Sequence, residues 1–198
     1  MNLLHRLIAQ AKNPSGFVGS LMLKIMNTAH YEMNKWALAK INIPESAVML
    51  DVGCGGGKTL QLLSNLNTYG KIYGIDYAEQ AVKDSIQANK PDIEMGKMFI
   101  QQACVTKMPF STGTFDVITA FQTHYFWSDI VGSITEIYRV LASQGCFLLV
   151  AESYKVNYHM TTYKTKEEME QLFHDIGFNT VNYALSPNQK WICIKGIK

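Results

Sequence analysis

The first 47 residues place apolar side chains at the spacing of helices. Residues 3–11 fit one helical face, and residues 13–16 (Asn-Pro-Ser-Gly) break the pattern. A second apolar face follows, made of Val18, Leu21, Met22, Ile25 and Met26. A third helix carries Tyr31 and Trp36 and ends before Pro44, because a residue that precedes proline is driven out of the helical conformation. We expect these faces to pack on a core, and the alternative is that they cap a ligand.

From residue 48 onward, short apolar runs alternate with helical segments. The runs predict strands over 48–52, 71–75, 97–102, 115–121 and 145–151, and two closing strands over 178–184 and 190–197. Helices are predicted over 58–67, 78–89, 129–141 and 165–175, with Pro91 closing the second. Thr165 and Glu168 fit a capping box at the start of the last helix, and Gly177 fits its end. Continuous apolar strands indicate a sheet covered on both faces, so we expect an α/β fold with an antiparallel edge.

Composition places the chain among ordinary globular proteins. Hydrophobic residues make up 47% and charged residues 17% of its 198 residues, so the chain is neither disordered nor fibrous. The net charge of +2 gives no reason to expect nucleic acid as a partner. No apolar run approaches the ~18 residues that a membrane span needs. We expect a monomer or homodimer without stable membrane association.

The four cysteines do not form a metal-binding pattern. Cys54, Cys104, Cys146 and Cys193 are far apart in the sequence, whereas zinc ligands come in closely spaced pairs. We therefore expect no metal. The first ten residues lack the uninterrupted apolar run and small-residue cleavage site of a secretory signal, so a reduced, cytoplasmic protein is expected.

The most informative stretch joins the first predicted strand to the helix that follows it. Residues 51–59 read Asp-Val-Gly-Cys-Gly-Gly-Gly-Lys-Thr. Several glycines let the backbone approach a ligand closely, and the start of the helix offers free N–H groups. Asp51 stands at the mouth of this turn, and Asp76 stands at the end of the next strand. Three cofactor classes bind to such a turn, and the two acidic residues discriminate among them.

Two of the three classes fit poorly. A phosphate-binding P-loop needs a glycine where this chain has Val52. The dinucleotide fingerprint needs a third glycine where this chain has Lys58, although Asp76 stands where a ribose-binding acid is expected. Both ligands present an anionic group to the turn, so the carboxylate of Asp51 would repel them.

The third class, S-adenosylmethionine, accounts for both acidic residues. Its methionine end carries an ammonium and its sulfonium is positive, so the charge of Asp51 becomes attractive. Asp76 can accept hydrogen bonds from both ribose hydroxyls. The alternative is that Asp51 only caps the turn and Asp76 only caps the next helix. Either acidic residue alone would more often be a cap, but the two acidic residues together with the glycines favour a cofactor site.

Several motifs resemble those of the class I S-adenosylmethionine-dependent methyltransferases, specifically the small type 11 group. They cover residues 48–152 and read LDVGCGGG at 50–57, IYGIDY at 72–77, MPF at 108–110, FDV at 115–117, EIYRVL at 136–141 and GCFL at 145–148. The resemblance implies a Rossmann-like, seven-stranded, mostly parallel sheet with an antiparallel last strand and helices on both faces. It also implies one structural domain overall, with an N-terminal helical cap over 1–47 and a methyltransferase core over 48–198.

The resemblance also assigns the cofactor-binding residues. The turn would hold the methionine end and Asp76 the ribose. The full set of candidates is Asp51, Gly53, Cys54, Gly55, Gly57, Asp76, Tyr77, Cys104, Val105, Phe121 and Gln122. The family often has an Asp that binds the adenine amine at the position of Cys104. A thiol is a poor acceptor, so we expect adenine to be bound mainly by backbone groups and packing.

Methyl transfer asks the protein to position two reactants and exclude water, because the sulfonium already activates the carbon. Residues 121–127 (Phe-Gln-Thr-His-Tyr-Phe-Trp) follow the fourth strand and would face the methyl group. His124 is the candidate general base, because histidine titrates near neutrality, and Tyr125 is a weaker candidate. A histidine among aromatic residues is more often structural. His30 and Tyr31 could close over the site, although a surface position is the commoner one.

We therefore expect a methyltransferase that acts on a small-molecule acceptor by in-line displacement. The apolar cap and the weak positive charge favour a small molecule over nucleic acid, whose recognition needs a basic face. Two alternatives stay open at this point. One is a catalytically weak module that binds S-adenosylmethionine, and the other is an NAD(P)-binding Rossmann reductase.

Overall fold

A computed structural model describes residues 3–198, with side-chain environments from residue 8 onward. Three helices come first: α1 (Leu3–Lys12), α2 (Gly16–Ala29) and α3 (Tyr31–Leu38). They confirm the three predicted N-terminal helices. The apolar face predicted for residues 3–11 lies partly outside the residues whose side chains are described.

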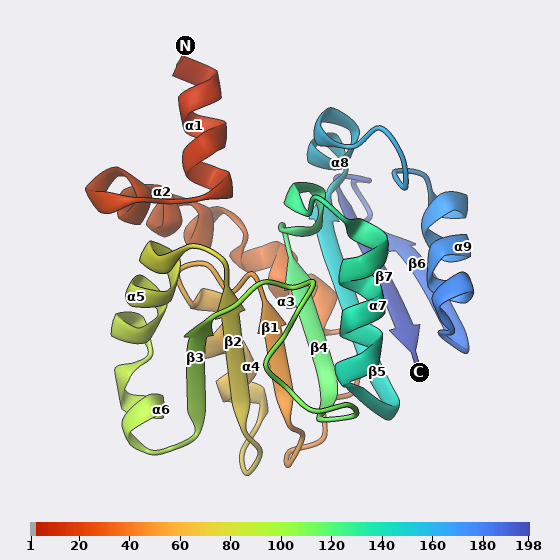
Figure 1. Cartoon of the computed structure of the whole chain (residues 1–198), viewed down its shortest axis with the longest axis horizontal. Coiled ribbons are helices and arrows are strands. Elements are labelled where there is room, and N and C mark those ends of the chain that lie inside the picture. Colours follow the sequence, from red (N-terminus) through yellow and green to blue (C-terminus); the bar gives the residue numbers. More distant parts are fainter. Residues whose placement is uncertain (1–2) are drawn as a thin grey trace.

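Seven strands then form a mixed sheet (Figure 1). They are β1 (Met49–Val52), β2 (Ile72–Asp76), β3 (Met98–Gln102), β4 (Phe115–Phe121), β5 (Leu141–Glu152), β6 (Thr180–Leu185) and β7 (Trp191–Ile197). Their order across the sheet is β3-β2-β1-β4-β5-β7-β6. The first five strands are parallel, and β7 runs antiparallel to both of its neighbours. The sheet confirms the predicted Rossmann-like fold with its antiparallel last strand.

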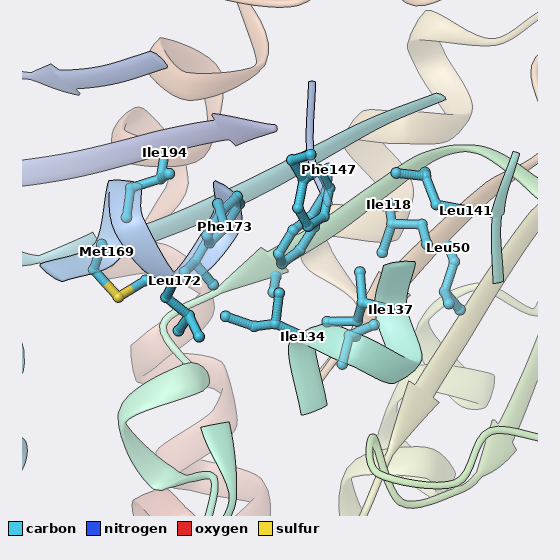
Figure 2. Packing of buried hydrophobic residues seen from close by; sticks show 14 of the residues in the cluster. Leu50, Ile118, Ile134, Ile137, Leu141, Phe147, Met169, Leu172, Phe173 and Ile194 are labelled. Atoms are coloured by element: carbon cyan, nitrogen blue, oxygen red, sulfur yellow. The ribbon is translucent and has the colours of Figure 1, made fainter. Parts of the chain in front are cut away.

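Helices cover both faces of the sheet. Those that follow β1 are α4 (Lys58–Leu66), α5 (Glu79–Ala88), α6 (Lys90–Glu94), α7 (Ile130–Val140), α8 (Ser153–His159) and α9 (Lys166–Ile176). On one face, Leu50 and Ile118 pack with α7 and α9 through Ile134 and Phe173 (Figure 2). On the other face, strand residues such as Met49 and Leu148 pack with α3 and α4. Successive strand residues point to opposite faces, so continuous apolar strands fill both layers.

The structure differs from the sequence prediction at a few element ends. α5 ends at Ala88, before Pro91, but Pro91 also lies in the first turn of a further helix, α6, because proline fits the first turn, where its missing N–H has no partner to lose. β5 begins at Leu141, four residues before the predicted start at Gly145. Helix α8 and a short 3₁₀ turn, η1 (His124–Phe126), were not predicted. The capping box of Thr165 and Glu168 and the stop at Gly177 are confirmed.

The prediction for the packed face of α2 is wrong. Val18, Leu21 and Ile25 are 57%, 50% and 57% exposed, and Phe17 beside them is 84% exposed. The residues that α2 buries are Gly19 and Leu23. Helical spacing shows that an apolar face exists but not which way it points, because the packing partner of a helix is set by the rest of the fold.

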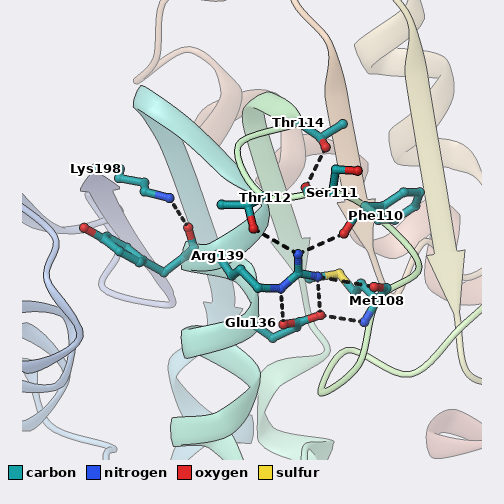
Figure 3. A network of polar contacts seen from close by, with 9 residues as sticks. Met108, Phe110, Ser111, Thr112, Thr114, Glu136, Arg139 and Lys198 are labelled. Atoms are coloured by element: carbon teal, nitrogen blue, oxygen red, sulfur yellow. Dashed lines mark hydrogen bonds and ion pairs between the residues drawn. The ribbon is translucent and has the colours of Figure 1, made fainter.

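A polar network fixes the segment that leads into β4 (Figure 3). The guanidinium of Arg139 donates two hydrogen bonds of 2.7 Å to the carboxylate of Glu136 and one of 2.9 Å to the carbonyl of Phe110. The same carboxylate accepts from the backbone N–H of Met108 at 2.8 Å. The network ties the predicted motif at residues 108–110 to α7. Residues 103–106, just before this motif, line a cavity.

Candidate functional site

A cavity of about 440 Å³ opens at the carboxyl ends of β1, β2 and β4. β2 lies on one side of β1 and β4 lies on the other. From β1 the chain therefore continues along the sheet through β2 and β3, and it then crosses to the other side of β1 to form β4. Such a reversal leaves a crevice at the carboxyl edge of an open α/β sheet, where ligands bind. Helices α1 and α2 lie above this edge (Figure 1), and residues of both line the cavity.

The glycine turn forms the floor of the cavity. Gly53 and Gly55 line it and have φ angles of +73° and +53°, which side chains disfavour. The N–H groups of Gly53 and Cys54 both donate to the carbonyl of Ile75, at 2.8 and 3.0 Å. A Cβ on Gly53 would lie 2.5 Å from the Oγ1 of Thr123. The turn therefore needs glycine both for its backbone conformation and for its contact with the segment after β4.

Asp76 lines the cavity at the end of β2. Its Oδ2 accepts from the N–H of Gly55 and its Oδ1 from the N–H of Ala78, both at 2.9 Å. Burial raises the pKa of this carboxyl, and the backbone hydrogen bonds partly oppose that rise. Each carboxylate oxygen can accept more than one hydrogen bond. Asp76 can thus stabilise the start of α5 and still bind two hydroxyls of a ligand.

Asp51 lies below the turn instead of at the surface of the cavity. Its side chain is 1% exposed, and its Oδ1 accepts a hydrogen bond of 2.7 Å from the hydroxyl of Thr119. Burial raises its pKa to about 7. Gly57 does not line the cavity either; it is the left-handed N-cap residue that precedes α4. The other predicted cofactor residues all line the cavity: Gly53, Cys54, Gly55, Asp76, Tyr77, Cys104, Val105, Phe121 and Gln122.

Gln122 is the strained residue of the site. It follows β4 with a φ of +57°, in the left-handed region, and is 4% exposed. Its amide is held on two sides: Nε2 donates to the sulfur of Met33 at 3.3 Å, and Oε1 accepts from the hydroxyl of Tyr125 at 2.8 Å. Strained backbone of this kind persists where the surroundings fix it, and it clusters at functional sites.

The two predicted catalytic candidates lie behind the cavity wall. His124 and Tyr125 are 4% and 7% exposed, and neither lines the cavity. Burial lowers the pKa of His124 to about 4 and raises that of Tyr125. His124 is therefore a neutral imidazole at physiological pH. A catalytic role for either residue stays a prediction.

Sequence reasoning identified only part of the roof of the cavity. His30, named as a residue that could close over the site, does line the cavity, and so does Met26 of the predicted apolar face. Leu23 and Asn27 of α2 and Asn34 of α3 line it too and were missed. Asn27 and Asn34 are polar, so a search for apolar residues at helical spacing passed over them.

His30 is the imidazole that faces the cavity. Its Nε2 lies 3.1 Å from the ammonium of Lys155, which in turn lies 2.7 Å from the carboxylate of Glu152. Burial first, and then the charge of Lys155, lower the pKa of His30 to about 4. An ammonium can only donate, so Lys155 donates to Nε2 and the imidazole proton resides on Nδ1.

The cavity fits S-adenosylmethionine. The glycine turn offers a floor without side chains, Asp76 offers two acceptor oxygens, and Tyr77 and Val105 flank the space beyond them. Asn34, whose buried amide oxygen has no partner among the described residues, also lines the cavity. The described residues hold no group of three or more His, Cys, Asp or Glu side chains arranged to bind a metal ion. None of their helices is long and apolar enough to cross a membrane.

Comparison with curated proteins identifies related sequences. The chain is 28% identical over 113 residues to a demethylmenaquinone methyltransferase of Lactiplantibacillus plantarum, covering 57% of this chain and 48% of the relative. It is 34% identical over 101 residues to a malonyl-[acyl-carrier protein] O-methyltransferase of Legionella pneumophila, covering 50% and 34%. It is 28% identical over 151 residues to the mitochondrial arginine-hydroxylase NDUFAF5 of Rattus norvegicus, covering 67% and 42%. The chain thus spans less than half the length of these relatives.

Solved structures share the fold. A SAM-dependent methyltransferase from Aquifex aeolicus superimposes with a TM-score of 0.73 at 19% identity, covering 90% of this chain and 97% of that one. A phosphoethanolamine-type N-methyltransferase of Haemonchus contortus, solved with S-adenosylhomocysteine, gives 0.72 at 14% identity, covering 85% and 52%. The family model described as a methyltransferase domain matches residues 50–149. The chain therefore belongs to this methyltransferase domain family.

Proposed function

We propose that the methyl acceptor is a small molecule that binds under helices α1–α3, at the end of the cavity farthest from Tyr77. The observation that supports this proposal is the roof itself. Residues from all three N-terminal helices line the cavity, opposite the strand ends. The cavity volume of about 440 Å³ lies within the range of small-molecule sites, roughly 300–1,000 Å³. A roofed chamber suits a compact acceptor better than a polymer.

Apolar side chains and the imidazole of His30 are the lining groups that we assign to the acceptor end. Met26 lines it from α2, and Phe126 and Trp127 line it from the segment after β4. The imidazole of His30 adds a donor at Nδ1, since Lys155 occupies Nε2. These walls exclude water, and the imidazole orients an oxygen or nitrogen of the acceptor. We therefore expect an acceptor that is partly apolar.

At the cofactor end, Asp76 would hold the ribose and the turn at 53–55 the methionine end. When bound, S-adenosylmethionine supplies a methyl group that its sulfonium has already activated. The attacking atom of the acceptor forms a bond to the methyl carbon while the carbon–sulfur bond breaks, and sulfur keeps the electron pair. The floor and the roof of the cavity hold the two partners in line, which is the main contribution that this reaction needs from a protein.

An acceptor screen tests the proposal. The chain is incubated with S-adenosylmethionine and, in separate pools, small molecules, peptides and RNA, and the formation of S-adenosylhomocysteine is measured. We expect turnover with a small molecule and none with the polymers. Turnover that requires a peptide or an RNA would overturn the assignment of the acceptor class.

A matched pair of variants tests the role of His30. His30→Ala should lower kcat/KM for the acceptor by about tenfold or more, the effect of losing an orienting hydrogen bond, while the affinity for S-adenosylhomocysteine stays within about twofold. His174→Ala, on α9 and away from the cavity, is the control and should change neither value. Equal losses of acceptor turnover in both variants would contradict a role for His30 in the site.

A further inference from the structure

Asn34 is a buried residue of α3 with half of its amide unused. Its side chain is 4% exposed, and its Nδ2 donates to the hydroxyl oxygen of Thr59 at 2.9 Å. Its Oδ1 is buried and has no partner among the described residues. An acceptor taken out of water without a partner is costly, so such atoms in folded proteins call for an explanation.

The position of Asn34 supplies the explanation. Asn34 and Thr59 both line the cavity, together with Gly53 and Gly55 of the glycine turn. Asn89 offers a comparison, because it also is buried with an unpaired Oδ1 but does not line the cavity. Of these two residues, only Asn34 lines the cavity, so only its unpaired oxygen belongs to a residue that can meet a ligand there.

The acidic residue at the mouth of the turn supplies no side-chain acceptor at the cavity surface. Asp51 was expected to face the cofactor ammonium, but its carboxyl lies below the turn and accepts from Thr119. Its charge can act at a distance, yet it offers no direct hydrogen bond to a group in the cavity. A neutral amide oxygen can provide that bond without the cost of burying a second charge.

We propose that Oδ1 of Asn34 accepts a hydrogen bond from the ammonium of the methionine end of the cofactor, so that α3 is part of the cofactor site. The proposal rests on the placement of the methionine end at the glycine turn. The hydrogen bond from Nδ2 to Thr59 holds the other end of the amide. α3 is itself fixed, since its Met33 and Ala37 are 1% and 0% exposed in the core. Asn34 is thus held beside the cavity by both its helix and its side chain.

Three ligands separate a direct contact from a structural effect. S-adenosylhomocysteine carries the whole amino-acid tail, its decarboxylated analogue keeps only the amine, and methylthioadenosine has neither group. Asn34→Leu keeps the volume of the side chain and removes both polar atoms. Asn34→Asp keeps an acceptor oxygen at the same place. Affinities are measured by isothermal titration, and the unfolding midpoint of each free variant is recorded.

We expect Asn34→Leu to weaken S-adenosylhomocysteine and its decarboxylated analogue by about tenfold, which corresponds to about 1.4 kcal/mol. Methylthioadenosine should bind to Asn34→Leu within about twofold of its affinity for the original chain, and Asn34→Asp should restore the affinity for the two amines. If Asn34→Leu does not fold, Asn34→Ala takes its place in the same comparison.

Three outcomes would overturn the proposal. One is an equal loss for methylthioadenosine, which would make Asn34 structural. Another is no loss for any ligand. The third is a loss for S-adenosylhomocysteine but not for the decarboxylated analogue, which would place the carboxylate at Asn34. Failure of the original chain to bind S-adenosylhomocysteine is a different result, because it would refute the cofactor placement and not the role of Asn34 alone.

Discussion

The floor and the roof of the cavity are built in different ways. The floor is the carboxyl edge of the sheet, where the buried Val52 and Ile75 line the cavity beside the glycine turn. The roof is a set of helices whose side chains reach into the cavity. α2, the middle helix of the roof, buries Gly19 and Leu23 and exposes a row of large apolar residues on its other side.

The difference between floor and roof suits them to two tasks, cofactor binding and acceptor binding. Backbone and glycine can be placed only by a rigid, well-packed sheet, so we expect the floor to fix the cofactor and to carry much of the stability. Side chains on a lightly packed helix can be exchanged at small cost, so the roof can adapt to an acceptor. The five predictions below test this division, starting with the largest effect.

Leu60→Ala should cause the largest loss of stability. Leu60 of α4 is completely buried against the floor. Removal of such a side chain costs its burial and leaves a cavity, typically about 2–5 kcal/mol in the free energy of unfolding. Urea denaturation measures the change. A loss below 1 kcal/mol, or one that Leu21→Ser on the roof equals, would contradict the division between floor and roof.

Asp76→Ala should cause the largest loss of cofactor affinity. The carboxylate is the acceptor at the cavity end of β2, and hydrogen bonds that involve a charged group are worth about 1.5–3 kcal/mol, so affinity should fall by roughly ten- to a hundredfold. Isothermal titration with S-adenosylhomocysteine and with methylthioadenosine should give the same loss for both, because both carry the ribose. A variant that loses stability but binds normally would make Asp76 only a helix cap.

Glu136→Gln should have an intermediate effect on stability. Its hydrogen bonds to Arg139 hold the pKa of this carboxyl below its usual range. Arg139 is 36% exposed, so solvent screens the pair and we expect a loss of about 1 kcal/mol near neutral pH. A lowered pKa means that the contribution is present above the ordinary pKa of Glu, about 4.3, and is lost as the pH falls through the folded value.

The measurement is urea unfolding of the original chain and of Glu136→Gln across this pH range. The difference between them should shrink as the solution becomes more acidic. A difference that stays constant down to pH 3, roughly one unit below the ordinary pKa, would show that the carboxylate charge does not carry the effect.

Asp51 should make cofactor binding depend weakly on pH. Burial holds its pKa at about 7 in the free chain, and a bound ammonium favours the ionised form. Affinity for S-adenosylhomocysteine should therefore rise a few-fold as the pH increases through about 7 and should then level off. Asp51→Asn should abolish that rise and should bind more weakly at the upper end. The same pH dependence in both proteins would assign it to another group.

Leu21→Ser should have the smallest effect. Leu21 is half exposed on the outer face of α2 and lies away from the cavity lining. Exposed substitutions usually change stability by less than about 0.5 kcal/mol. Both the unfolding midpoint and the affinity for S-adenosylhomocysteine should stay unchanged within error. A clear loss in either would show that this face of α2 packs against something in solution.

The same division explains what could be predicted from the sequence. The floor was predictable because its signals are local and strong: apolar strands, glycines at 53–57, and Asp76 directly after a strand. Nine of the eleven cofactor candidates line the cavity, and of these Cys104, Val105, Phe121 and Gln122 came from the family resemblance. Asp51 does not line the cavity because its side chain lies on a buried face of the sheet, where the hydroxyl of Thr119 donates a hydrogen bond to it. The sequence alone does not show which residue of β4 lies beside Asp51.

The roof could not be predicted to the same extent. Periodicity located three helices, but the direction of the α2 face depends on contacts with α1 and α5 that no local pattern records. His30 and Asn34 matter because tertiary packing brings them over the turn. α8 escaped prediction although its Lys155 contacts His30. That contact joins residues far apart in the chain, so neither segment alone gives a sign of it.

The most direct test is isothermal titration of S-adenosylhomocysteine into the original chain and into Asp76→Ala, with NADH as the competing ligand. The account predicts one-to-one binding with a Kd well below ~1 mM, a marked loss in the variant, and no binding of NADH. Absence of binding to the original chain up to ~1 mM, or displacement of S-adenosylhomocysteine by NADH, would contradict the assignment of the glycine floor to this cofactor.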